Sequence, residues 1–253
     1  MKILTLNLHC FEESNISGNQ KRIIDTILKE DIDVVLLQEV AQSKNKKVVF
    51  NDIKEDNYGY KLKQDLAKSN INYYYHYKFG NQAFGMYEEG LAILSKTKLT
   101  KKHHFFISKT KDYNNWNTRI IVSAKTSIEN KEIVFINAHL GWTEGNEVFE
   151  DQVDSLMKNL DNKDINIIAG DFNISPGTKE YKYFIEKGYK DLYYNNDVDY
   201  FNIPTHVSDI DQKDGQSRID YIMSNKEFKI INRKILFNKD MVSDHYGLLI
   251  EIK

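Results

Sequence analysis

The stretch from residue 73 to residue 140 contains five strand-like runs in succession, with no helical segment between them. Each run is short, apolar and rich in β-branched or aromatic residues, which is typical of buried strands. The runs are "YYYHYKF" (73–79), "GLAILS" (90–95), "HHFFIS" (103–108), "RIIVSAKT" (119–126) and "EIVFINAHL" (132–140). Neighbouring parallel strands are joined by crossover connections, which are usually helical, and no helix is predicted between these five strands. This stretch therefore excludes a fold in which strands and helices alternate regularly.

Six further strands and four helices are predicted outside this stretch. The strands are expected at 2–7, 33–39, 165–171, 218–224, 229–237 and 247–252. The helices are expected at 19–30, 51–69, 147–160 and 178–188, where apolar residues recur every three or four positions. About eleven strands and four helices predict an α+β fold in which two packed sheets carry helices outside. Because no Gly/Ser-rich or Pro-rich linker and no internal repeat is present, we expect a single domain over residues 1–253.

The charge and cysteine content narrow the possible partners. Lys plus Arg is 35 and Asp plus Glu is 37, so the chain lacks the basic excess of a non-specific nucleic-acid binder. Cys10 is the only cysteine, which excludes an intrachain disulfide. The apolar N-terminal stretch is interrupted by Asn7 and His9, and no segment approaches the ~20 apolar residues of a membrane span. We expect a cytoplasmic protein with no membrane partner and no obligate protein partner.

Polar residues stand where several predicted strands end. "IIAGDFNISPG" (167–177) places Asp171 and Asn173 directly after a buried run, and Gly170 is expected to let the backbone turn. A plain turn is one interpretation, because Asp, Asn, Ser, Pro and Gly all favour turns. A ligand site is the other, because a carboxylate at the edge of a core needs a partner. Asn7, Glu39 and His139 hold comparable positions at strand ends. Asp220 lies inside the strand predicted at 218–224, and Asp244 and His245 precede the strand predicted at 247–252.

The acidic and amide side chains of this set suit a divalent metal. Glu39 and Asp244 supply carboxylates, and Asn7 and Asp171 add further oxygen atoms. Such hard oxygen ligands are preferred by Mg²⁺, with Mn²⁺ as the alternative ion. Mg²⁺ characteristically takes few carboxylates, several waters and a substrate phosphate.

The two histidines complete a set that can hydrolyse a phosphoester. His139 and His245 can donate hydrogen bonds to a phosphate, and Asp220 can orient an imidazole and stabilise its charged form. A metal, an acid that activates water and two imidazoles are the parts of metal-assisted phosphoester hydrolysis.

The chain resembles the endonuclease/exonuclease/phosphatase superfamily, which has the deoxyribonuclease-like fold. The resemblance rests on short motifs that occur in family order along nearly the whole chain. They are "LTLN" (4–7), "DVVLLQE" (33–39), "GLAILS" (90–95), "NAHL" (137–140), "GDFN" (170–173), "RIDYI" (218–222) and "SDH" (243–245). The resemblance implies a four-layer α/β/β/α sandwich, in which two mixed sheets pack face to face and the site lies at one end.

The resemblance also implies roles for the matching acids and amides. Glu39 would be the main metal ligand, with Asn7 and Asp244 beside it. Asp171 would activate or orient the attacking water. Asn173 would orient that water or hold a phosphate oxygen.

The remaining matching residues would act on the phosphate. His139 and His245 would stabilise the pentavalent transition state, and Asp220 would pair with His245. Arg119 opens a predicted strand. It can be a bidentate phosphate clamp or an ordinary salt bridge at the edge of a sheet, and the sequence leaves both interpretations open.

The segment after His139 favours a sugar phosphate as the substrate. Together with "MKILTLNLHCFEE" (1–13) and "EGLAILS" (89–95), "NAHLGWTEGNEVFEDQVDSL" (137–156) resembles the bacterial branch that contains maltose 6'-phosphate phosphatase. Trp142, in the segment "GWTEGNEVFED" (141–151), can stack on a sugar ring or can be a packing residue of the core or rim. This segment has no Lys or Arg and carries four acids: Glu144, Glu147, Glu150 and Asp151. Such a wall would repel a polyanionic backbone. We therefore predict an Mg²⁺-dependent phosphomonoesterase acting on a sugar phosphate, with a nuclease that cleaves phosphodiesters as the alternative.

Overall fold

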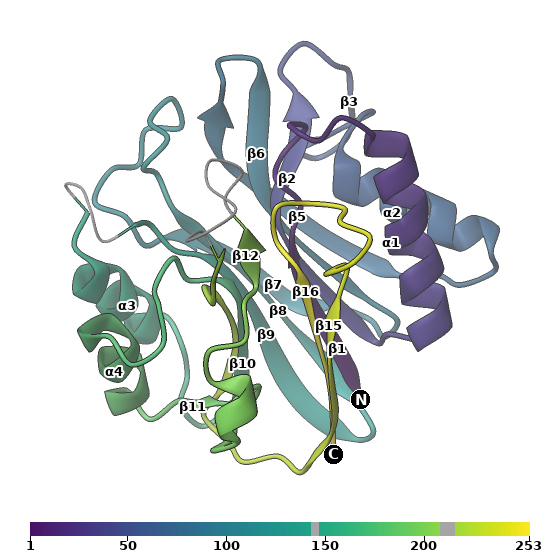
Figure 1. Ribbon diagram of the computed structural model, residues 1–253. Coiled ribbons are helices and arrows are strands. Elements are labelled where there is room, and N and C mark those ends of the chain that lie inside the picture. The colour runs from purple at the N-terminus through teal and green to yellow at the C-terminus, as the bar shows by residue number, and fades with distance from the viewer. Residues whose placement is uncertain (143–146, 208–215) are drawn as a thin grey trace.

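Two six-stranded β-sheets pack face to face in the computed structural model, which describes residues 1–142, 147–207 and 216–253 (Figure 1). The first sheet has the order β15 (Ile230–Leu236), β16 (Gly247–Ile252), β1 (Lys2–Asn7), β2 (Val34–Ser43), β6 (Tyr87–Ser95) and β5 (Tyr74–Ala83). The second has the order β11 (Lys190–Asp191), β14 (Asp220–Ser224), β10 (Ile165–Asp171), β9 (Lys131–His139), β8 (Ile120–Ile128) and β7 (Thr100–Phe106). Both sheets are mixed, because β1 runs parallel to β2 and β9 runs parallel to β10 whereas their other neighbours are antiparallel.

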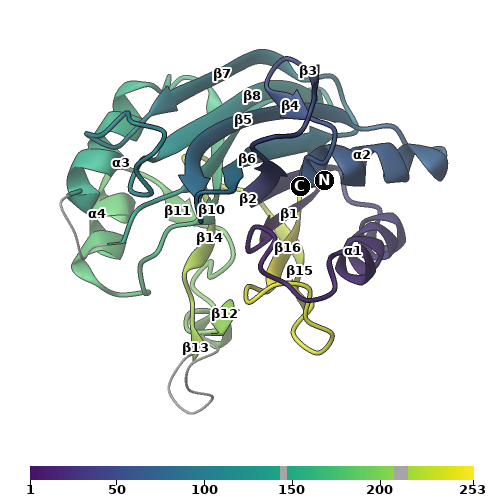
Figure 2. The same cartoon turned by 90° about the horizontal axis from the view of Figure 1, so that it is seen from above.

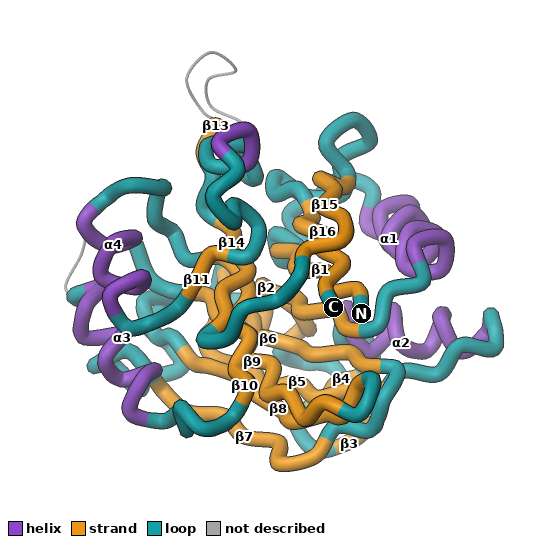
Figure 3. The backbone as a smooth tube through the Cα atoms, turned by 90° about the horizontal axis from the view of Figure 1, so that it is seen from below, coloured by secondary structure: helices purple, strands orange, loops and turns teal. Residues whose placement is uncertain are grey.

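Two helices cover the outer face of each sheet. The helices α1 (Ile16–Glu30) and α2 (Tyr58–Lys68) pack on the first sheet, and α3 (Phe149–Lys158) and α4 (Lys179–Glu186) pack on the second (Figure 3). Seen from above, the two sheets lie between these helix pairs (Figure 2). The predicted four-layer α/β/β/α sandwich is therefore confirmed. Within the described residues, no helix is both long enough and apolar enough to cross a membrane.

The alternation of side chains along the central strands produces the layers of the core. In β2, Val34 and Leu36 belong to the core between the two sheets, whereas Val35 and Leu37 belong to the core under α1 and α2. Successive side chains of a strand point to opposite faces, and both faces of this sheet are covered. The strand therefore reads as a continuous apolar run, which makes it recognisable from the sequence.

The short elements differ from the sequence-based prediction. The helix expected at 51–69 begins only at Tyr58, so the prediction for residues 51–57 is wrong. Asn57 caps the helix by accepting a hydrogen bond from the Tyr60 backbone N–H, which fixes the first turn there. The preceding residues form a small hairpin of β3 (Val48–Phe50) and β4 (Ile53–Lys54). The sequence also did not reveal β11, β12 (His206–Val207), β13 (Gln216–Ser217) or the 3-10 helix η1 (Val198–Tyr200).

A buried polar network joins the two sheets close to the end where β1, β9 and β10 finish. Asn137 on β9 accepts a hydrogen bond from Gln38 Nε2 at 2.6 Å. The Asn137 amide donates to the carbonyls of Leu37 and Ala92, each at 2.8 Å. Satisfied buried polar groups specify one packing arrangement, because leaving any of them unpaired costs free energy. The network therefore fixes β9 against β2 and β6 immediately below the polar strand ends.

Candidate active site

Three of the predicted site residues lie in one row across the second sheet. Asp171, the last residue of β10, is in register with His139 on β9 and with Asp220 on β14. Residues directly opposite one another on neighbouring strands present their side chains on the same face, about 5 Å apart. The strand register therefore brings these three residues together, although they are far apart in the sequence.

Asp171 is the centre of the site. Its Oδ2 atom accepts a hydrogen bond from Asn7 Nδ2 at 3.1 Å, and the same nitrogen donates to Glu39 Oε1 at 2.9 Å. The Nε2 atoms of His139 and His245 lie 3.7 Å and 3.6 Å from that same Oδ2. A single carboxylate oxygen is thus contacted from the first sheet and flanked by two imidazoles.

Two site residues have left-handed backbone conformations. Glu39 has a φ of 49° and lies at a register shift between β2 and β6, and Asn173 has a φ of 54°. This conformation costs of order 1–3 kcal/mol for a residue other than glycine and persists where surrounding contacts hold it. A bulge changes the direction of a side chain, and here Glu39 accepts the bond from Asn7. Asn173 is held by donating from its amide to the carbonyl of Leu140 at 2.9 Å.

The turn expected at Gly170 is wrong. Gly170 remains in β10, paired with Ala138 on β9 and Tyr221 on β14. Its φ is 146°, and a Cβ atom at this position would lie 1.9 Å from the carbonyl oxygen of Ala138. The glycine therefore permits a close approach of β9 to β10, one residue before Asp171, rather than a change of direction.

His245 and Asp220 form a buried imidazole–carboxylate pair. His245 Nδ1 lies 2.9 Å from Asp220 Oδ2, and both residues are buried. Burial lowers the His245 pKa, but the negative charges of Asp220, Asp171 and Asp244 outweigh it and raise the pKa to about 10. His245 is therefore a cation at neutral pH, with Nδ1 donating to Asp220 and Nε2 facing Asp171.

His139 has the opposite charge state. Burial, and then the positive charges of Arg119 and His245, hold the His139 pKa well below its usual range. The imidazole is therefore neutral at neutral pH, and its Nδ1 faces Glu89 Oε1 at 3.7 Å. Titratable groups whose surroundings push their pKa values apart are typical of sites that move protons.

Glu89 on β6 is a site residue that the sequence interpretation missed. Burial and then repulsion from Glu39 raise the Glu89 pKa to about 8. The signal was present in "EEGLAILS", where an acid stands close to a buried run. Its neighbour Glu88 instead pairs with Lys54 at 2.8 Å, outside the site. The sequence alone does not show whether Glu88 or Glu89 points into the site, because that depends on which face of β6 each side chain lies on.

Asp244 lies between two histidines that the sequence interpretation did not assign. Its Oδ1 is 3.6 Å from His9 Nδ1, and its Oδ2 is 3.7 Å from His206 Nε2. Burial raises the Asp244 pKa, but the nearby imidazoles of His206, His245 and His9 lower it overall. The His9 backbone N–H also donates to Asn7 Oδ1 at 3.0 Å, which links this group to the centre of the site.

Arg119 also faces the site. It is buried and lines a small recess together with Glu89 and His139. Its guanidinium donates to the backbone carbonyls of Trp116 and Thr118, at 2.7 Å and 3.4 Å, and within the described residues its buried Nε has no partner. The salt bridge that the sequence also allowed is not seen in the described part of the chain. A buried guanidinium with a free N–H is able to bind an anion.

The donor set fits a hard divalent cation. Its carboxylate and amide oxygens are of the type that Mg²⁺ and Mn²⁺ bind. Burial raises the pKa of Asp171 to about 7 and that of Glu89 to about 8, so ionising both acids costs free energy in the protein alone. Among the described residues the buried Oδ1 of Asn173 also has no hydrogen-bond partner. A bound cation with its waters would satisfy both features.

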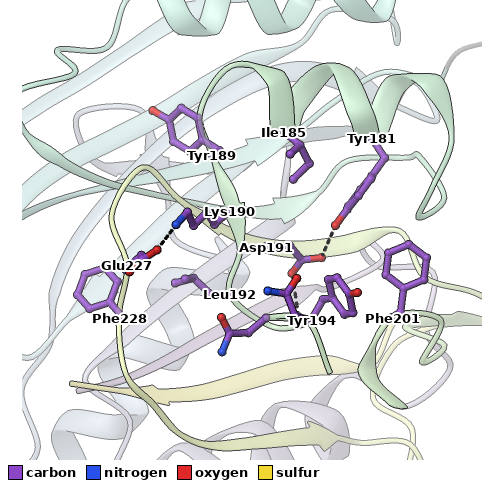
Figure 4. A pocket seen from close by; sticks show the side chains of 12 residues that line it. Tyr181, Ile185, Tyr189, Lys190, Asp191, Leu192, Tyr194, Phe201, Glu227 and Phe228 are labelled. Carbon is purple, nitrogen blue, oxygen red and sulfur yellow. Dashed lines mark hydrogen bonds and ion pairs between the residues drawn. The ribbon is translucent and has the colours of Figure 1, made fainter. Parts of the chain in front are cut away.

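A cavity of about 520 Å³ lies elsewhere, at the far end of β14, between α4 and the residues that follow β11 (Figure 4). Aromatic rings line it, and Lys190 and Glu227 form an ion pair at its side. Its buried acid Asp191 is already paired with Arg218 at 2.7 Å and accepts from the Tyr181 hydroxyl at 3.3 Å. Because the carboxylate of Asp191 is already paired with Arg218 and Tyr181, it is poorly placed to act on a substrate. We therefore do not take this cavity as the candidate active site.

An acidic, imidazole-flanked centre at one end of a four-layer sandwich defines a class of protein: hydrolases that act on phosphoesters, generally with a divalent metal. The sequence profile of the endonuclease/exonuclease/phosphatase family matches residues 4–245, and the chain belongs to that family. No protein of curated function matches the chain significantly.

Solved structures agree with this assignment. An endonuclease/exonuclease/phosphatase family protein from Leptotrichia buccalis is 30% identical, with a TM-score of 0.90, and the match covers 100% of this chain and 99% of that one. The mannosyl-6-phosphatase Bt3783 of Bacteroides thetaiotaomicron is 20% identical, with a TM-score of 0.69 and coverages of 100% and 99%. D. rerio TDP2 complexed with a single-strand DNA product is 15% identical, with a TM-score of 0.73 and coverages of 100% and 98%. The latter two likenesses show the fold alone.

Proposed function

We propose that this chain is a divalent-metal-dependent phosphomonoesterase that acts on a small sugar phosphate. The observation that carries the proposal is the arrangement around Asp171. One buried carboxylate oxygen lies 3.6 Å from His245 and 3.7 Å from His139, and Asn7 links it to Glu39. We assign to these residues the roles of a base, two phosphate-binding groups and a metal ligand around one phosphate.

In this proposal Glu39 is the main ligand of Mg²⁺, with Asn7 and Asp244 beside it, and Mn²⁺ is the alternative ion. Mg²⁺ is commonly held by one or two carboxylates together with waters and substrate phosphate oxygens. The ion, when bound, polarises a phosphoryl oxygen and neutralises charge that develops on it. It would also balance the buried acids.

Asp171 is proposed to take a proton from the attacking water. Its pKa of about 7 suits a general base at neutral pH, because the best base has a pKa near the working pH. The Asn173 backbone N–H donates to Asp171 Oδ1 at 2.9 Å, which fixes the carboxylate plane and leaves Oδ2 toward the imidazoles. The Asn173 side chain is proposed to orient the water or a phosphate oxygen.

His245, His139 and Arg119 are proposed to stabilise the negative charge of the transition state. His245 is cationic and points Nε2 at the centre of the site, while Asp220 holds its other nitrogen. Arg119 is a second fixed cation, and neutral His139 donates a hydrogen bond from Nε2. Preorganised donors of this kind are each worth about 10²–10³ in kcat in other hydrolytic sites.

The proposed substrate class rests on the surface beside His139. Trp142 is 48% exposed, three residues after His139, so its ring is available for stacking. Of the four acids in 141–151, Glu144 lies outside the described residues. Glu147 accepts hydrogen bonds from two backbone N–H groups, and Asp151 pairs with Lys109 at 2.9 Å. The rim is therefore less negative than the sequence indicates, and the mannosyl-6-phosphatase activity of a structural neighbour supports the choice of a sugar phosphate.

Phosphate release from a panel of hexose and disaccharide 6-phosphates, with plasmid nicking measured in parallel, tests the proposal. We expect phosphate release in Mg²⁺, slow or no nicking, and loss of both signals in Glu39→Gln. Lys21→Ala, which removes an exposed charge paired with Asp25 on α1, is the control and should behave like the wild type. Efficient nicking with no phosphate released from any sugar phosphate would overturn the proposal in favour of the nuclease.

A further inference from the structure

The chain contains two tryptophans, and both are exposed. Trp116 is 59% exposed and Trp142 is 48% exposed. Trp116 stands three residues before Arg119, and Trp142 stands three residues after His139. Single exposed aromatic rings are common on protein surfaces, so it is the position of these two beside one polar site that indicates a binding role.

The strand pairing places the two tryptophans at the same end of the second sheet. β8 and β9 are antiparallel, with Ile121 opposite Ala138, so the beginning of β8 adjoins the end of β9. Trp116 precedes β8 and Trp142 follows β9. The Trp116 carbonyl also accepts the 2.7 Å hydrogen bond from Arg119, which fixes the backbone of Trp116 against the candidate phosphate-binding group.

Independent contacts hold the two tryptophan-bearing segments together. Glu147, which follows Trp142 in the chain, accepts hydrogen bonds from the backbone N–H groups of Lys109 and Thr110 at 2.7 Å and 3.0 Å. These two residues lie in the connection between β7 and β8 that also carries Trp116. Lys109 Nζ pairs with Asp151 on α3 at 2.9 Å. The segments before β8 and after β9 therefore lie side by side at the rim of the site.

We propose that Trp116 and Trp142 together form an aromatic clamp that holds the sugar ring of the substrate, a pyranose bearing a phosphate. The inference rests on the proposed function and adds Trp116 as a residue that determines specificity. A pyranose ring has apolar faces that stack on indole and hydroxyl groups around its edge. Asn117, next to Trp116 in the chain, carries an amide that can meet such a hydroxyl.

A sugar suits this rim better than a nucleic-acid strand does. A strand needs unpaired cations that follow its phosphates. Here Lys109 is paired with Asp151, and the buried guanidinium of Arg119 faces the recess shared with Glu89 and His139. Lys111 is the one other cation of residues 109–119, too few to follow the phosphates of a strand. One terminal phosphate in that recess and a neutral ring between the tryptophans match these groups.

Tryptophan fluorescence tests the clamp directly, because the two proposed residues are the only tryptophans in the chain. The wild-type protein is titrated with maltose in EDTA, so that neither metal nor turnover is needed. We expect a saturable change in emission. Trp116→Phe and Trp142→Phe should each show a smaller change, because each variant keeps one of the two tryptophans. No change with maltose, or a change with single-stranded DNA alone, would overturn the clamp.

Kinetics provide the second test. The specificity ratio is the kcat/KM for glucose 6-phosphate divided by that for glycerol 3-phosphate, which has no ring. We expect Trp116→Ala to lower this ratio about tenfold, mainly through KM, on the scale of one aromatic stacking contact. Trp116→Phe should restore most of the ratio. Val198→Ala, at a 77% exposed position in η1, is the control and should leave the ratio as in the wild type.

The outcomes separate this inference from the proposed function. Release of phosphate from no member of the sugar-phosphate panel by the wild type would contradict the phosphatase proposal, and the maltose titration would still decide the clamp. Hydrolysis of glucose 6-phosphate with a ratio that Trp116→Ala leaves unchanged would overturn the clamp and leave the phosphatase proposal standing. Equal losses on both substrates would assign Trp116 to holding Arg119 instead, which also overturns the clamp.

Discussion

Replacing Asp220 by Asn should change the charge of His245 and therefore the pH range in which the protein is active. Asp220 is fully buried, and its Oδ2 lies 2.9 Å from His245 Nδ1. The His245 pKa is raised from about 6.5 to about 10, although burial alone lowers it. At 1.36 kcal/mol per unit, the site stabilises the imidazolium by on the order of 5 kcal/mol, and Asp220 makes the largest favourable contribution.

The Asn variant keeps the burial of His245 and loses the nearest negative charge, so the His245 pKa must fall. We expect kcat to fall by about 10²–10³ with a smaller change in KM, because the charge of His245 is used mainly in the transition state. The alkaline limb of the pH profile should move to lower pH. Phosphate release measured from pH 5 to pH 10 checks both, and Asp154→Asn, which breaks an exposed pair with Lys187, is the control.

Stability gives an independent measurement of the same pair. A folded-state pKa above the unfolded value means that the pair stabilises the fold fully below pH ~6.5 and that this contribution is lost as the pH rises toward about 10. In EDTA, the wild type should therefore be more stable than Asp220→Asn at pH 6, by a margin that shrinks by pH 10. A margin that does not vary with pH, together with an unmoved alkaline limb, would refute the reasoning.

Three further predictions concern the metal and the acids. Glu39→Gln should lower activity at least ~100-fold, and EDTA should abolish wild-type activity until Mg²⁺ or Mn²⁺ is restored; full activity in EDTA would exclude the metal mechanism. Asp171 and Glu89 have pKa values raised to about 7 and about 8, so ionising them costs stability. The melting temperature of the metal-free protein should fall between pH ~4 and pH 8, and Mg²⁺ should raise it more at pH 8 than at pH 6. Glu89→Gln should lower kcat about tenfold with little change in KM, whereas Glu88→Gln should affect stability alone; equal effects of the two on kcat would contradict the assignment of Glu89.

Much of this fold could be predicted because its strands are buried on both faces. The central strands appear as apolar runs such as "DVVLLQE", and α1 and α3 carry clear helical periodicity. The elements of two or three residues, such as β4 and β11, are too short to show any period. At residues 51–57 the helix cap at Asn57 decided the outcome, and the apolar pattern alone did not reveal it.

The candidate site was predictable where a polar residue ends an apolar strand or lies within one. Asp171, His139 and Asp220 stand out for that reason, and the sheet register then places them in one row. Glu89 and His206 did not stand out, because one follows another acid and the other lies in a two-residue strand. The role of Gly170 was also misjudged, since the close approach of Ala138 is a tertiary contact.

The central claim is that water, activated beside Asp171, attacks the phosphorus of a sugar phosphate. Hydrolysis of glucose 6-phosphate in ¹⁸O-labelled water tests this most directly, because the position of the label reports which bond is cleaved. We predict one labelled oxygen in the released phosphate and none in the glucose, with the reaction lost in Asp171→Asn. Label in the glucose hydroxyl, or undiminished phosphate release by Asp171→Asn, would contradict the account.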